Sequence, residues 1–356
     1  MKGLILSGGK GTRLRPLTHT SAKQLVPVAN KPVLFYGIDA MVEAGITDIG
    51  IVVGETHEEI RAAVGDGGKL GCRATYIMQP DPLGLAHAVK ISEGFLKDDP
   101  FVMYLGDNLL AHGITSFVTE FRLLAPTAQI LLTRVPNPQQ FGVAELVDGR
   151  VVRLEEKPKT PRSDLALVGV YMFTAPIFEA VNAIKPSGRG ELEITDAIQY
   201  LIDKGYTVSP HIVSGWWKDT GKLEDMLEAN RLILDTLERR VDGEVRGRCQ
   251  IDGKVVVEKG AVVEDSVIRG PVIIGAGSRI LRAYVGPFTS IDAGVTVRDS
   301  EIEHSIVLEG SAIEDLKTRL EDSLVGRNCR IHRSLIMPRA LRFMIGDNSE
   351  VGIQWE

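Results

Sequence analysis

The chain has 356 residues, a length that predicts two or three domains and excludes a single small module. With 44% hydrophobic, 25% charged and 6% aromatic residues, its composition is that of a globular protein and disfavours a disordered, collagen-like or membrane-spanning chain. Forty-one basic and 47 acidic residues give a net charge of −6, so the overall charge does not favour nucleic acid and any phosphate binding must be local.

The cysteines and the N-terminus indicate a cytoplasmic protein. Cys72, Cys249 and Cys329 lie far apart and form no C-x-x-C pair, so we expect neither a disulfide framework nor a zinc site. Residues 4–6 form an apolar run that residues 7–9 (SGG) end, and the run is too short for a signal peptide or a membrane span. We therefore interpret it as a first buried strand.

Up to about residue 240, β-rich runs alternate with helical patterns, which is typical of a mostly parallel sheet covered by helices. The expected strands are residues 4–6, 49–53, 75–78, 101–105, 130–135 and 167–173. The expected helices are residues 31–44, 57–64 and 85–95, and a last helix whose apolar face runs from Leu223 to Leu237 with Arg239 and Arg240 at its end. That helix is expected to close a first domain of residues 1–240.

After residue 250, aliphatic residues recur every six positions, and each triplet begins 17 residues after the one before. The triplets are Ile251, Val257, Val263; Ile268, Ile274, Ile280; and Val285, Ile291, Val297. This repeat predicts a triangular parallel β-helix over residues 241–356, with one aliphatic side chain of each rung pointing inward. The period slips over residues 311–319, where 314–317 are expected to form a loop, and resumes around 324–331. An irregular β-sandwich is the alternative.

A glycine-rich turn, residues 7–16 (SGGKGTRLRP), follows the first strand at the edge where open α/β sheets bind ligands. Its glycines let the backbone approach phosphate oxygens, and Arg13 adds a planar cation. The turn is not a Walker A loop, because no G-K-[ST] closes it, and Leu14 replaces the last glycine of G-x-G-x-x-G. We interpret it as a phosphate loop, with a plain structural turn as the alternative.

Three more residues have chemistry that suits a nucleotide site. Lys23 precedes an apolar run and is either a second cation for a triphosphate or a solvated flank. Asp107 follows the strand at 101–105, where a carboxylate is well placed to hold Mg²⁺. Asp219, more than a hundred residues later, is either a second ligand of that metal or a cap of the helix that begins near Gly221.

Seven short motifs occur in order within residues 1–240. They are GGKGTRL at 8–14, KQL at 23–25, GDN at 106–108, FGV at 141–143, EEKP at 155–158, GELEITD at 190–196 and WKDTG at 217–221. Together they resemble the glucose-1-phosphate thymidylyltransferases, and the β-helical tail resembles the long form of that family. The resemblance implies a Rossmann-like, mostly parallel sheet with helices on both faces, followed by a left-handed parallel β-helix of hexapeptide repeats.

The resemblance also implies a role for each matching residue. The nucleotide would be held by Leu6, Gly8, Gly11, Thr12, Arg13, Lys23, Gln24, Gln79, Gly84 and Asp107, with Gln24 and Gln79 on the thymine edge, for which two amides are suited. The sugar phosphate would be held by Asn108, Gly142, Glu156, Lys157 and the backbone near Leu167. Asp107 and Asp219 would bind Mg²⁺, and Arg13, Lys23 and Lys157 would be the catalytic cations.

The implied reaction joins dTTP and α-D-glucose 1-phosphate to give dTDP-glucose and pyrophosphate. The sugar phosphate is already an oxyanion at neutral pH, so the reaction needs placement and charge neutralisation and no general base. Ala22, Phe141 and His87 depart from the usual motifs and leave the base and sugar selectivity open. The alternatives are the same chemistry with UTP or N-acetylglucosamine 1-phosphate, and a non-catalytic subunit that binds a nucleotide sugar.

The remaining candidates concern the tail and the assembly. Hexapeptide repeats also occur in acetyltransferases, so His304 is a candidate base there, although no other motif supports acetyl transfer. The other histidines show no metal-site spacing and are expected to be structural or solvated. We expect a homo-oligomer, with a trimer through the β-helix as the first hypothesis, and no nucleic-acid or membrane partner.

Overall fold

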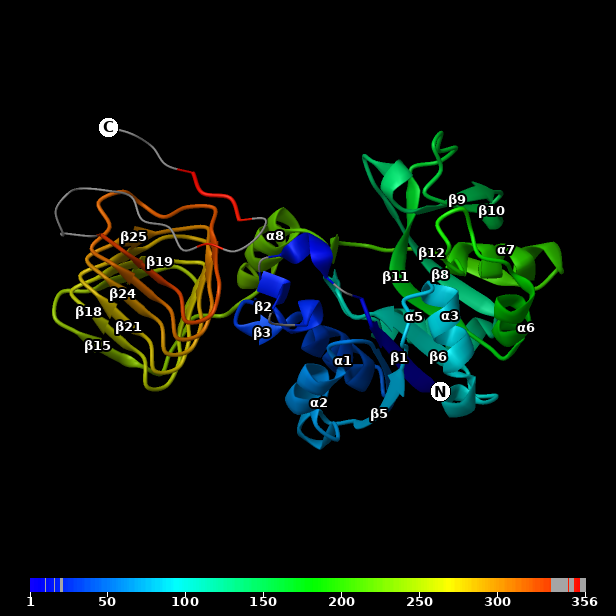
Figure 1. Ribbon diagram of the computed structural model, residues 1–356, viewed down its shortest axis with the longest axis horizontal. Coiled ribbons are helices and arrows are strands. Elements are labelled where there is room, and N and C mark those ends of the chain that lie inside the picture. Colours follow the sequence, from blue (N-terminus) through cyan, green and yellow to red (C-terminus); the bar gives the residue numbers. More distant parts are fainter. Residues whose placement is uncertain (10, 16, 20–21, 334–344, 346–348, 353–356) are drawn as a thin grey trace. The chain divides into compact units, whose positions relative to one another are not determined.

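The computed structural model describes residues 1–9, 11–15, 17–19, 22–333, 345 and 349–352. It divides into two compact units, the first made of Met1–Lys10, Ser21–Leu25 and Val33–Asp219 and the second of Gly11–Thr20, Val26–Pro32 and Thr220–Glu356 (Figure 1). The expected first domain, residues 1–240, differs from the first unit of the structure. It also included Gly11–Thr20, Val26–Pro32 and the helix after residue 220, which belong to the second unit. Within the described ranges, no helix has the length and apolar character needed to cross a membrane.

The first unit is built on a nine-stranded mixed sheet. The strand order is β10-β9-β11-β6-β1-β4-β5, with β8 also beside β11 and β12 beside β8. The strands are β1 (Lys2–Ser7), β4 (Asp48–Val53), β5 (Arg73–Met78), β6 (Phe101–Leu105), β8 (Ala128–Arg134), β9 (Gly142–Val147), β10 (Arg150–Glu156), β11 (Leu165–Phe173) and β12 (Val208–Ile212). Strands β1, β4, β5 and β6 run parallel, whereas β11 is antiparallel to β6, β8 and β9. The expected α/β sheet is therefore confirmed.

Helices cover both faces of this sheet, because alternate residues of its buried strands point to opposite sides. Leu4 and Leu6 join a core cluster with residues of α3, α6 and α7, whereas Ile5 joins a second cluster with residues of α1, α2 and α5. The helices are α1 (Val33–Glu43), α2 (His57–Val64), α3 (Leu85–Ile91), α4 (Glu93–Leu96), α5 (Thr115–Leu124), α6 (Pro176–Ala183) and α7 (Ile194–Asp203).

Two expected helices end earlier than the apolar pattern predicts. The helix expected at 85–95 is divided between α3 and α4 at Ser92, whose hydroxyl donates to the Ala88 carbonyl at 2.7 Å. The last helix, α8 (Leu223–Leu234), stops before Leu237, and Arg240 starts a strand; the prediction that Arg239 and Arg240 end this helix is wrong. Leu237 still packs beside Leu234, so its place in the apolar pattern reflects burial beyond the end of the helix.

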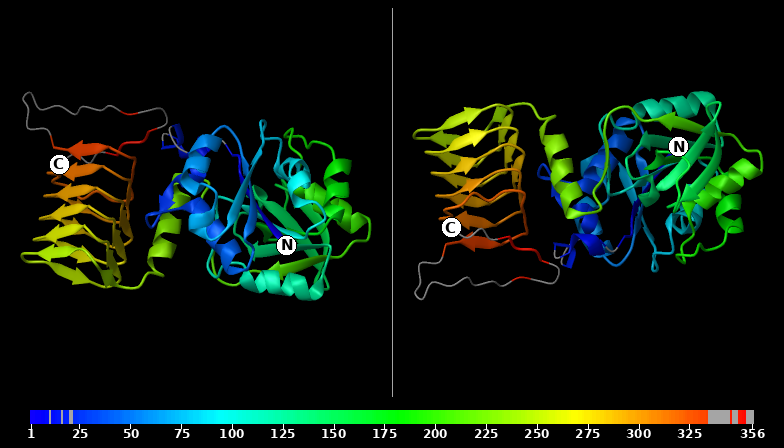
Figure 2. Two further views of the ribbon diagram at one scale, coloured as in Figure 1. Left: turned by 90° about the horizontal axis from the view of Figure 1, so that it is seen from below. Right: turned by 90° about the horizontal axis from the view of Figure 1, so that it is seen from above.

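The second unit contains a parallel β-helix of three sheets whose stacked coils are visible in Figure 2. The first sheet comprises β14 (Arg240–Val241), β17 (Val255–Val257), β20 (Val272–Ile274), β23 (Thr289–Ile291), β26 (Ile306–Val307) and β28 (Leu324–Val325). The second comprises β15 (Glu244–Arg246), β18 (Val262–Glu264), β21 (Arg279–Leu281), β24 (Thr296–Arg298), β27 (Ala312–Glu314) and β29 (Arg330–His332), and the third β16 (Gln250–Asp252), β19 (Val267–Arg269), β22 (Tyr284–Val285) and β25 (Glu301–Ile302). The hexapeptide prediction is confirmed.

The repeated aliphatic residues are the inward rungs of this β-helix. Ile251 pairs with Ile268 and Ile268 with Val285, in the register that the 17-residue spacing predicts. The later rungs pair Ile291 with Val307 and Val307 with Val325, so one coil is a residue shorter and the next a residue longer. The expected loop at 314–317 is wrong at its first residue, because residue 314 still pairs within β27.

Buried serines satisfy the corners of the coils. The Ser278 hydroxyl donates to the Asp292 carbonyl at 2.7 Å and accepts from the Val295 amide at 3.1 Å in the next coil. The Ser311 hydroxyl makes the same pair of bonds with Gly326 and Cys329. Each serine thus bonds to backbone groups of the neighbouring coil at positions where an unpaired polar group would be costly.

Asn230 on α8 joins three segments of the second unit. It is fully buried, and its Oδ1 accepts from the Ala29 amide at 2.9 Å and from the Ser290 hydroxyl. Its Nδ2 donates to the Phe288 carbonyl at 3.1 Å. Ala29 lies in the turn between the short strands β2 (Pro27–Val28) and β3 (Lys31–Pro32), so one side chain links this turn, α8 and the β-helix.

We expect Asn230→Ala to lower the free energy of unfolding by about 3 kcal/mol, because it leaves polar groups of the β2–β3 turn and of the β-helix without their partner. Chemical denaturation followed by circular dichroism measures this change. Glu228→Gln, on an exposed position of the same helix, is the control and should change the free energy by less than about 0.5 kcal/mol. An Asn230→Ala protein as stable as the control would contradict this account.

Candidate functional site

The residues expected to bind substrates in the first unit gather at the carboxyl ends of its parallel strands. Gly8 follows β1, Gln79 follows β5 and Gly106 follows β6. The Gly106 amide donates to the Leu6 carbonyl at 2.9 Å, and a Cβ on Gly106 would stand only 2.9 Å from that oxygen. Glycine is therefore required there, and Leu6 uses its carbonyl to hold the neighbouring strand end.

Two glutamine side chains border the glycine turn after β1. A Cβ on Gly8 would stand 3.0 Å from Oε1 of Gln79, and a Cβ on Gly9 would stand 3.8 Å from Nε2 of Gln24. Gln24 lies in the 3₁₀ turn η3 (Lys23–Leu25) and is 3% exposed. Its Oε1 is buried without a hydrogen-bond partner among the described residues. Both predicted base-binding amides therefore lie beside a turn that has no Cβ atoms.

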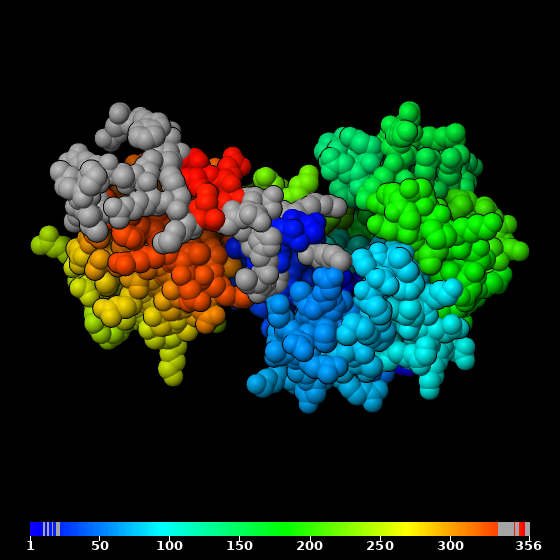
Figure 3. All heavy atoms as spheres, viewed as in Figure 1, coloured from blue at the N-terminus to red at the C-terminus, as the bar shows by residue number. Residues whose placement is uncertain are grey.

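Gly84 is held against a segment that sequence reasoning gave no role. Its φ is +104°, and a Cβ there would stand 2.4 Å from the Leu192 carbonyl oxygen. The Leu192 amide donates to the Leu83 carbonyl at 2.7 Å, and the Ala86 amide donates to the Leu192 carbonyl at 3.1 Å. Figure 3 shows the cyan and green segments that carry these residues in contact at the surface. Both conformation and space demand glycine at position 84.

The rest of the glycine-rich turn belongs to the second unit. Gly11 has a φ of +63° and precedes the 3₁₀ turn η1 (Thr12–Leu14), and its carbonyl accepts from the Thr18 hydroxyl at 2.7 Å. Thr12 is exposed. The side chain of Arg13 lies outside the described part of the structure. The phosphate-binding roles of Gly11, Thr12 and Arg13 remain predictions.

An ion pair and an amide fix the carboxylate of Asp107. The Lys23 ammonium contacts Oδ2 of Asp107, and the side-chain amide of Asn108 donates to Oδ1 of Asp107 at 2.8 Å. Burial raises the pKa of Asp107, but Lys23 and the Asn108 hydrogen bond outweigh burial and hold this pKa below its usual value. Asp107 is therefore ionised at neutral pH, and Lys23 is not the solvated flank of the alternative reading.

Asp219 lies next to this centre because two short strands pair. Strand β13 (Trp217–Asp219) runs antiparallel to β7 (Asn108–Leu110), with Asp219 opposite Asn108. The Trp217 indole donates to Oδ1 of Asn108 at 2.6 Å, as does the Gly169 amide at 3.3 Å. The ladder therefore places Asp219 one register position from Asp107, although more than a hundred residues separate them.

Three of the predicted sugar-binding residues, Gly142, Glu156 and Leu167, form a second group on β9, β10 and β11, whereas Asn108 lies on β7 beside Asp107. A Cβ on Gly142 would stand 2.7 Å from Leu167, 2.7 Å from Thr195 and 3.0 Å from Oε2 of Glu156, so the four residues are in contact. Burial and the Glu193 carboxylate raise the pKa of Glu156, and Lys157 and Arg189 offset this only in part. A carboxyl group that is costly to ionise here is suited to hydrogen-bond neutral hydroxyl groups.

Lys157 stands at the end of β10 with its side chain accessible. Its φ is +44°, and its amide donates to the Phe141 carbonyl at 2.9 Å. The side chain is 39% exposed, and its Nζ lies 4.0 Å from Oε1 of Glu156, beyond hydrogen-bond distance. The ammonium group is therefore accessible to an anionic ligand beside the Gly142 group.

Several residues of the site were missed from the sequence. Arg189 donates to both oxygens of the buried Glu193 at 2.9 Å and to Glu156 at 3.4 Å. Thr195 borders Gly142, and Gly169 leaves the space that the Asn108 side chain occupies. Glu193 and Thr195 lie in the GELEITD motif, which was recognised in the sequence without a role being assigned to its residues. Gly169 lies inside a strand and gave no signal.

The donor set at Asp107 and Asp219 fits Mg²⁺. This ion binds through one or two carboxylates and completes its coordination with water and substrate phosphates. The described residues contain no cluster of three or more His, Cys, Asp or Glu side chains that could enclose a metal. The carboxylates of Asp107 and Asp219 lie at neighbouring register positions, and Asp107 is also paired with Lys23. Such a pair suits a Mg²⁺ ion whose other ligands are water and nucleotide phosphates.

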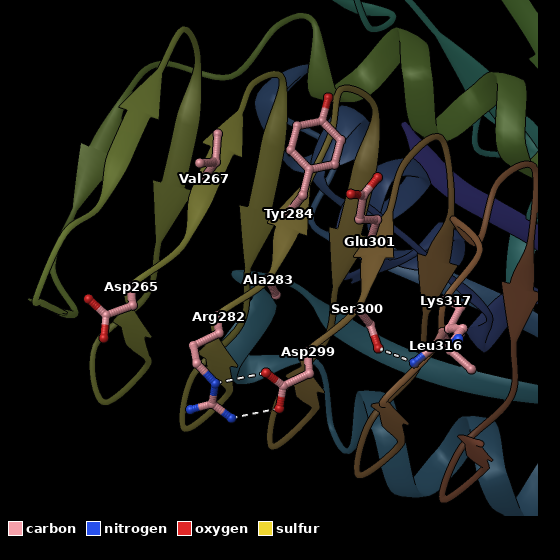
Figure 4. A pocket seen from close by; sticks show the side chains of 10 residues that line it. All are labelled: Asp265, Val267, Arg282, Ala283, Tyr284, Asp299, Ser300, Glu301, Leu316 and Lys317. Carbon is pink, nitrogen blue, oxygen red and sulfur yellow. Dashed lines mark hydrogen bonds and ion pairs between the residues drawn. The ribbon is translucent and has the colours of Figure 1, made fainter. Parts of the chain in front are cut away.

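A groove on the β-helix is a separate feature (Figure 4). Its charged walls include Arg282, which pairs with Asp299 at 2.6 Å, and Tyr284 and Glu301 stand farther along the same coils. None of the described residues that line it is a histidine. His304 lies elsewhere and pairs with Asp322, so the structure adds no support for acetyl transfer at His304.

The chain is similar to known proteins over its whole length. The family described as nucleotidyl transferase matches residues 2–236. Proteins of Streptomyces griseus and Streptomyces antibioticus, each named glucose-1-phosphate thymidylyltransferase, are 57% and 58% identical over 354 and 356 residues. The alignments cover 99% of this chain in both cases, and 99% and 100% of those proteins.

A solved structure supports the same fold. A crystal structure of UDP-glucose pyrophosphorylase complexed with UDP-glucose is 25% identical, with a TM-score of 0.60. It covers 66% of this chain and 98% of that chain. With the mixed sheet, the site at its edge and the full-length similarity, this chain belongs to the nucleotidyl transferase family.

Proposed function

We propose that this chain transfers a thymidylyl group from dTTP to α-D-glucose 1-phosphate, giving dTDP-glucose and pyrophosphate. One observation carries the proposal. The sheet edge of the first unit has two amides beside a glycine turn, and a cation and two carboxylates at the next strand end. The names of the two Streptomyces proteins, which match this chain from end to end, specify the same substrates.

The proposed nucleotide site uses Gly8, Gln24, Gln79 and Gly84 for the base and the turn. Amide groups have both donors and acceptors, and thymine has an N–H between two carbonyl groups, so two amides can pair with its edge. Gly8 and Gly84 are proposed to let a flat ring lie close to the backbone, although the Cβ position of Gly84 itself is filled by the Leu192 carbonyl group. The backbone at Leu6, Gly11 and Thr12, with Arg13, is proposed to hold the phosphates.

The proposed sugar-phosphate site uses Asn108, Gly142, Glu156, Leu167 and Lys157. Glu156 has a raised pKa and accepts or donates hydrogen bonds to glucose hydroxyl groups. Within the described residues, one hydrogen of the Asn108 side-chain NH₂ group is donated to Asp107. The other can bond to the sugar. Lys157 is proposed to pair with the phosphate of the sugar.

In this mechanism the sugar phosphate oxygen attacks the α-phosphorus of dTTP and pyrophosphate leaves. Repulsion between the two anionic substrates opposes the attack, and Lys23, Lys157 and Arg13 lower it while holding the groups in line. Asp107 and Asp219 are proposed to hold Mg²⁺, which when bound neutralises phosphate charge and orients the pyrophosphate leaving group.

A second candidate keeps the chemistry and replaces dTTP with UTP. The similarity to UDP-glucose pyrophosphorylase favours it, because thymine and uracil share the same imide edge and differ by one methyl group. A single methyl group gives only about 10- to 200-fold discrimination in a pocket. N-Acetylglucosamine 1-phosphate and a non-catalytic nucleotide-sugar-binding subunit are the further alternatives.

Pyrophosphate release tests these alternatives directly. The purified chain is mixed with Mg²⁺ and each pair drawn from dTTP or UTP and glucose 1-phosphate or N-acetylglucosamine 1-phosphate. We expect the highest kcat/KM with dTTP and glucose 1-phosphate. A preference for another pair would support the corresponding alternative substrate, and no release with any pair would support the binding subunit.

The assembly and location are proposed from the sequence. We propose a homo-oligomer, with a trimer through the β-helix first, and a cytoplasmic location. Light scattering of the purified chain tests the oligomer, and a monomer would contradict it.

We expect Asp107→Asn to reduce kcat with Mg²⁺ by at least about a thousandfold, because the carboxylate that pairs with Lys23 and is proposed to bind the metal is lost. Pyrophosphate release at saturating substrates measures it. Asp148→Asn, in an exposed turn with a φ of +51°, is the control and should leave kcat unchanged. A near-normal rate in Asp107→Asn would exclude the metal-binding role.

We expect Lys157→Met to lower kcat/KM for glucose 1-phosphate by about 10- to 100-fold, since a charge-assisted hydrogen bond contributes about 1.5–3 kcal/mol. Steady-state kinetics with varied glucose 1-phosphate measure the loss. The exposed Lys159 provides the matched control, and Lys159→Met should behave as the wild type. Equal kinetics for the two variants would show that Lys157 does not bind the sugar phosphate.

A further inference from the structure

Two acceptors fix the direction of the Gln79 side-chain amide. Its Nε2 lies 3.4 Å from the Gly84 carbonyl oxygen and 3.0 Å from Nδ1 of His87. A carbonyl oxygen only accepts, so the NH₂ end must face Gly84 and the carbonyl end must face away. Oε1 is accordingly the Gln79 atom near Gly8, 3.0 Å from the place of a Cβ on that glycine. Gln79 therefore presents an acceptor to the glycine turn.

His87 can keep this orientation only while its ring accepts a hydrogen bond. Nδ1 must then be without a proton, and the proton of the neutral ring is on Nε2. Burial and the nearby Lys90 lower the pKa of His87, and Asp81 opposes them in part. The ring is neutral at neutral pH. A protonated ring would donate at both nitrogens and conflict with the Gln79 NH₂ group.

The resulting pair of amide groups matches one kind of base edge. Nε2 of Gln24 is the nearest atom to the Cβ position of Gly9, so a donor stands beside the adjacent glycine. An acceptor complements the N3–H of thymine or uracil, and a donor complements a carbonyl oxygen of the same base. Cytosine has an unprotonated N3 and an amino group at this edge, so both contacts would be reversed.

We propose that His87 is a positioning residue that holds the Gln79 amide with its oxygen toward the base, and thereby selects imide nucleobases over cytosine. This inference rests on the proposed function, because it assumes that the base lies against Gly8 and Gly9. It concerns His87, which is not itself proposed to touch the substrate. A site with fixed hydrogen-bonding groups rejects a mismatched ligand strongly, because buried polar groups are left unpaired.

Two substitutions separate positioning from packing. His87→Leu removes the acceptor at similar size, whereas His87→Gln keeps an acceptor on a flexible side chain. His211→Leu is the control, because His211 lies on β12 and pairs with Glu120 at 2.5 Å. The full-length proteins are assayed with Mg²⁺, glucose 1-phosphate and either dTTP or dCTP, and equilibrium binding of each nucleotide is measured by calorimetry.

For His87→Leu we expect KM and Kd for dTTP to rise about tenfold, the dTTP over dCTP preference to fall about tenfold, and kcat and KM for glucose 1-phosphate to stay within about twofold. His87→Gln should restore dTTP binding to within about threefold of the wild type, and His211→Leu should match it. In a Gln79→Ala background, His87→Leu should have no further effect. This double-mutant comparison distinguishes action through Gln79 from a local packing change.

The inference is overturned if His87→Leu keeps the wild-type preference for dTTP over dCTP, or if it lowers kcat with KM unchanged. If His87→Leu does not fold, the His87→Gln and Gln79→Ala proteins provide the test instead. A His87→Gln protein that loses the preference for dTTP over dCTP contradicts the inference. Failure of the proposed function is distinguishable, because wild-type protein would then release no pyrophosphate, while calorimetry with dTTP and dCTP still reports the base preference.

Discussion

Close approach at the strand ends is the constraint on which the site depends. At Gly106 the Leu6 carbonyl oxygen occupies the space of a Cβ, at Gly169 the Asn108 side chain does, and at Gly84 the Leu192 backbone does. Each glycine lets a group of a distant segment approach the backbone more closely than a side chain would allow. A side chain at any of these positions would clash with that group and force the two segments to shift.

Charge in the first unit is arranged in two centres of different character. At Asp107, the Lys23 ammonium and the Asn108 side-chain amide lower the pKa and keep the carboxylate ionised, which is the form that binds a metal ion. At Glu156, burial and Glu193 raise the pKa, and the positive charges of Lys157 and Arg189 oppose this rise only in part. The difference follows from the partners, since both side chains are carboxyl groups at the ends of strands.

The β-helix contributes order to the second unit through polar groups as much as through its aliphatic rungs. Serine hydroxyls bond to successive coils at the corners, and Asn230 bonds to the turn that contains Ala29. That turn follows the KQL motif directly in the chain, and the segment Gly11–Thr20 belongs to the same unit. Two segments of the N-terminal sequence are thus part of the unit that contains the β-helix, which a boundary at residue 240 does not reveal.

Much of the architecture could be predicted from the sequence, because it depends on periodicity. Six of the nine strands of the sheet and the 17-residue register of the β-helix follow from where apolar residues recur, since burial of alternate or every sixth residue leaves a direct pattern; β9, β10 and β12 were not predicted. The end of α8 could not be predicted, because Leu237 is partly buried beyond the helix, and apolar spacing does not distinguish a residue in the helix from one packed after its end. The motifs also indicated Gln24, Asp107 and Asp219 by position, and the resemblance to the family indicated Gln79.

The sequence by itself determined which chemical groups this protein has, because residue type and motif order set their chemistry. Only the tertiary structure decided which groups meet. The β7–β13 ladder places Asp219 opposite Asn108, one register position from Asp107, and His87 contacts Gln79 through a hydrogen bond across a loop. These contacts depend on backbone direction and on space left by distant glycines such as Gly169, and neither is visible as a local pattern of residues.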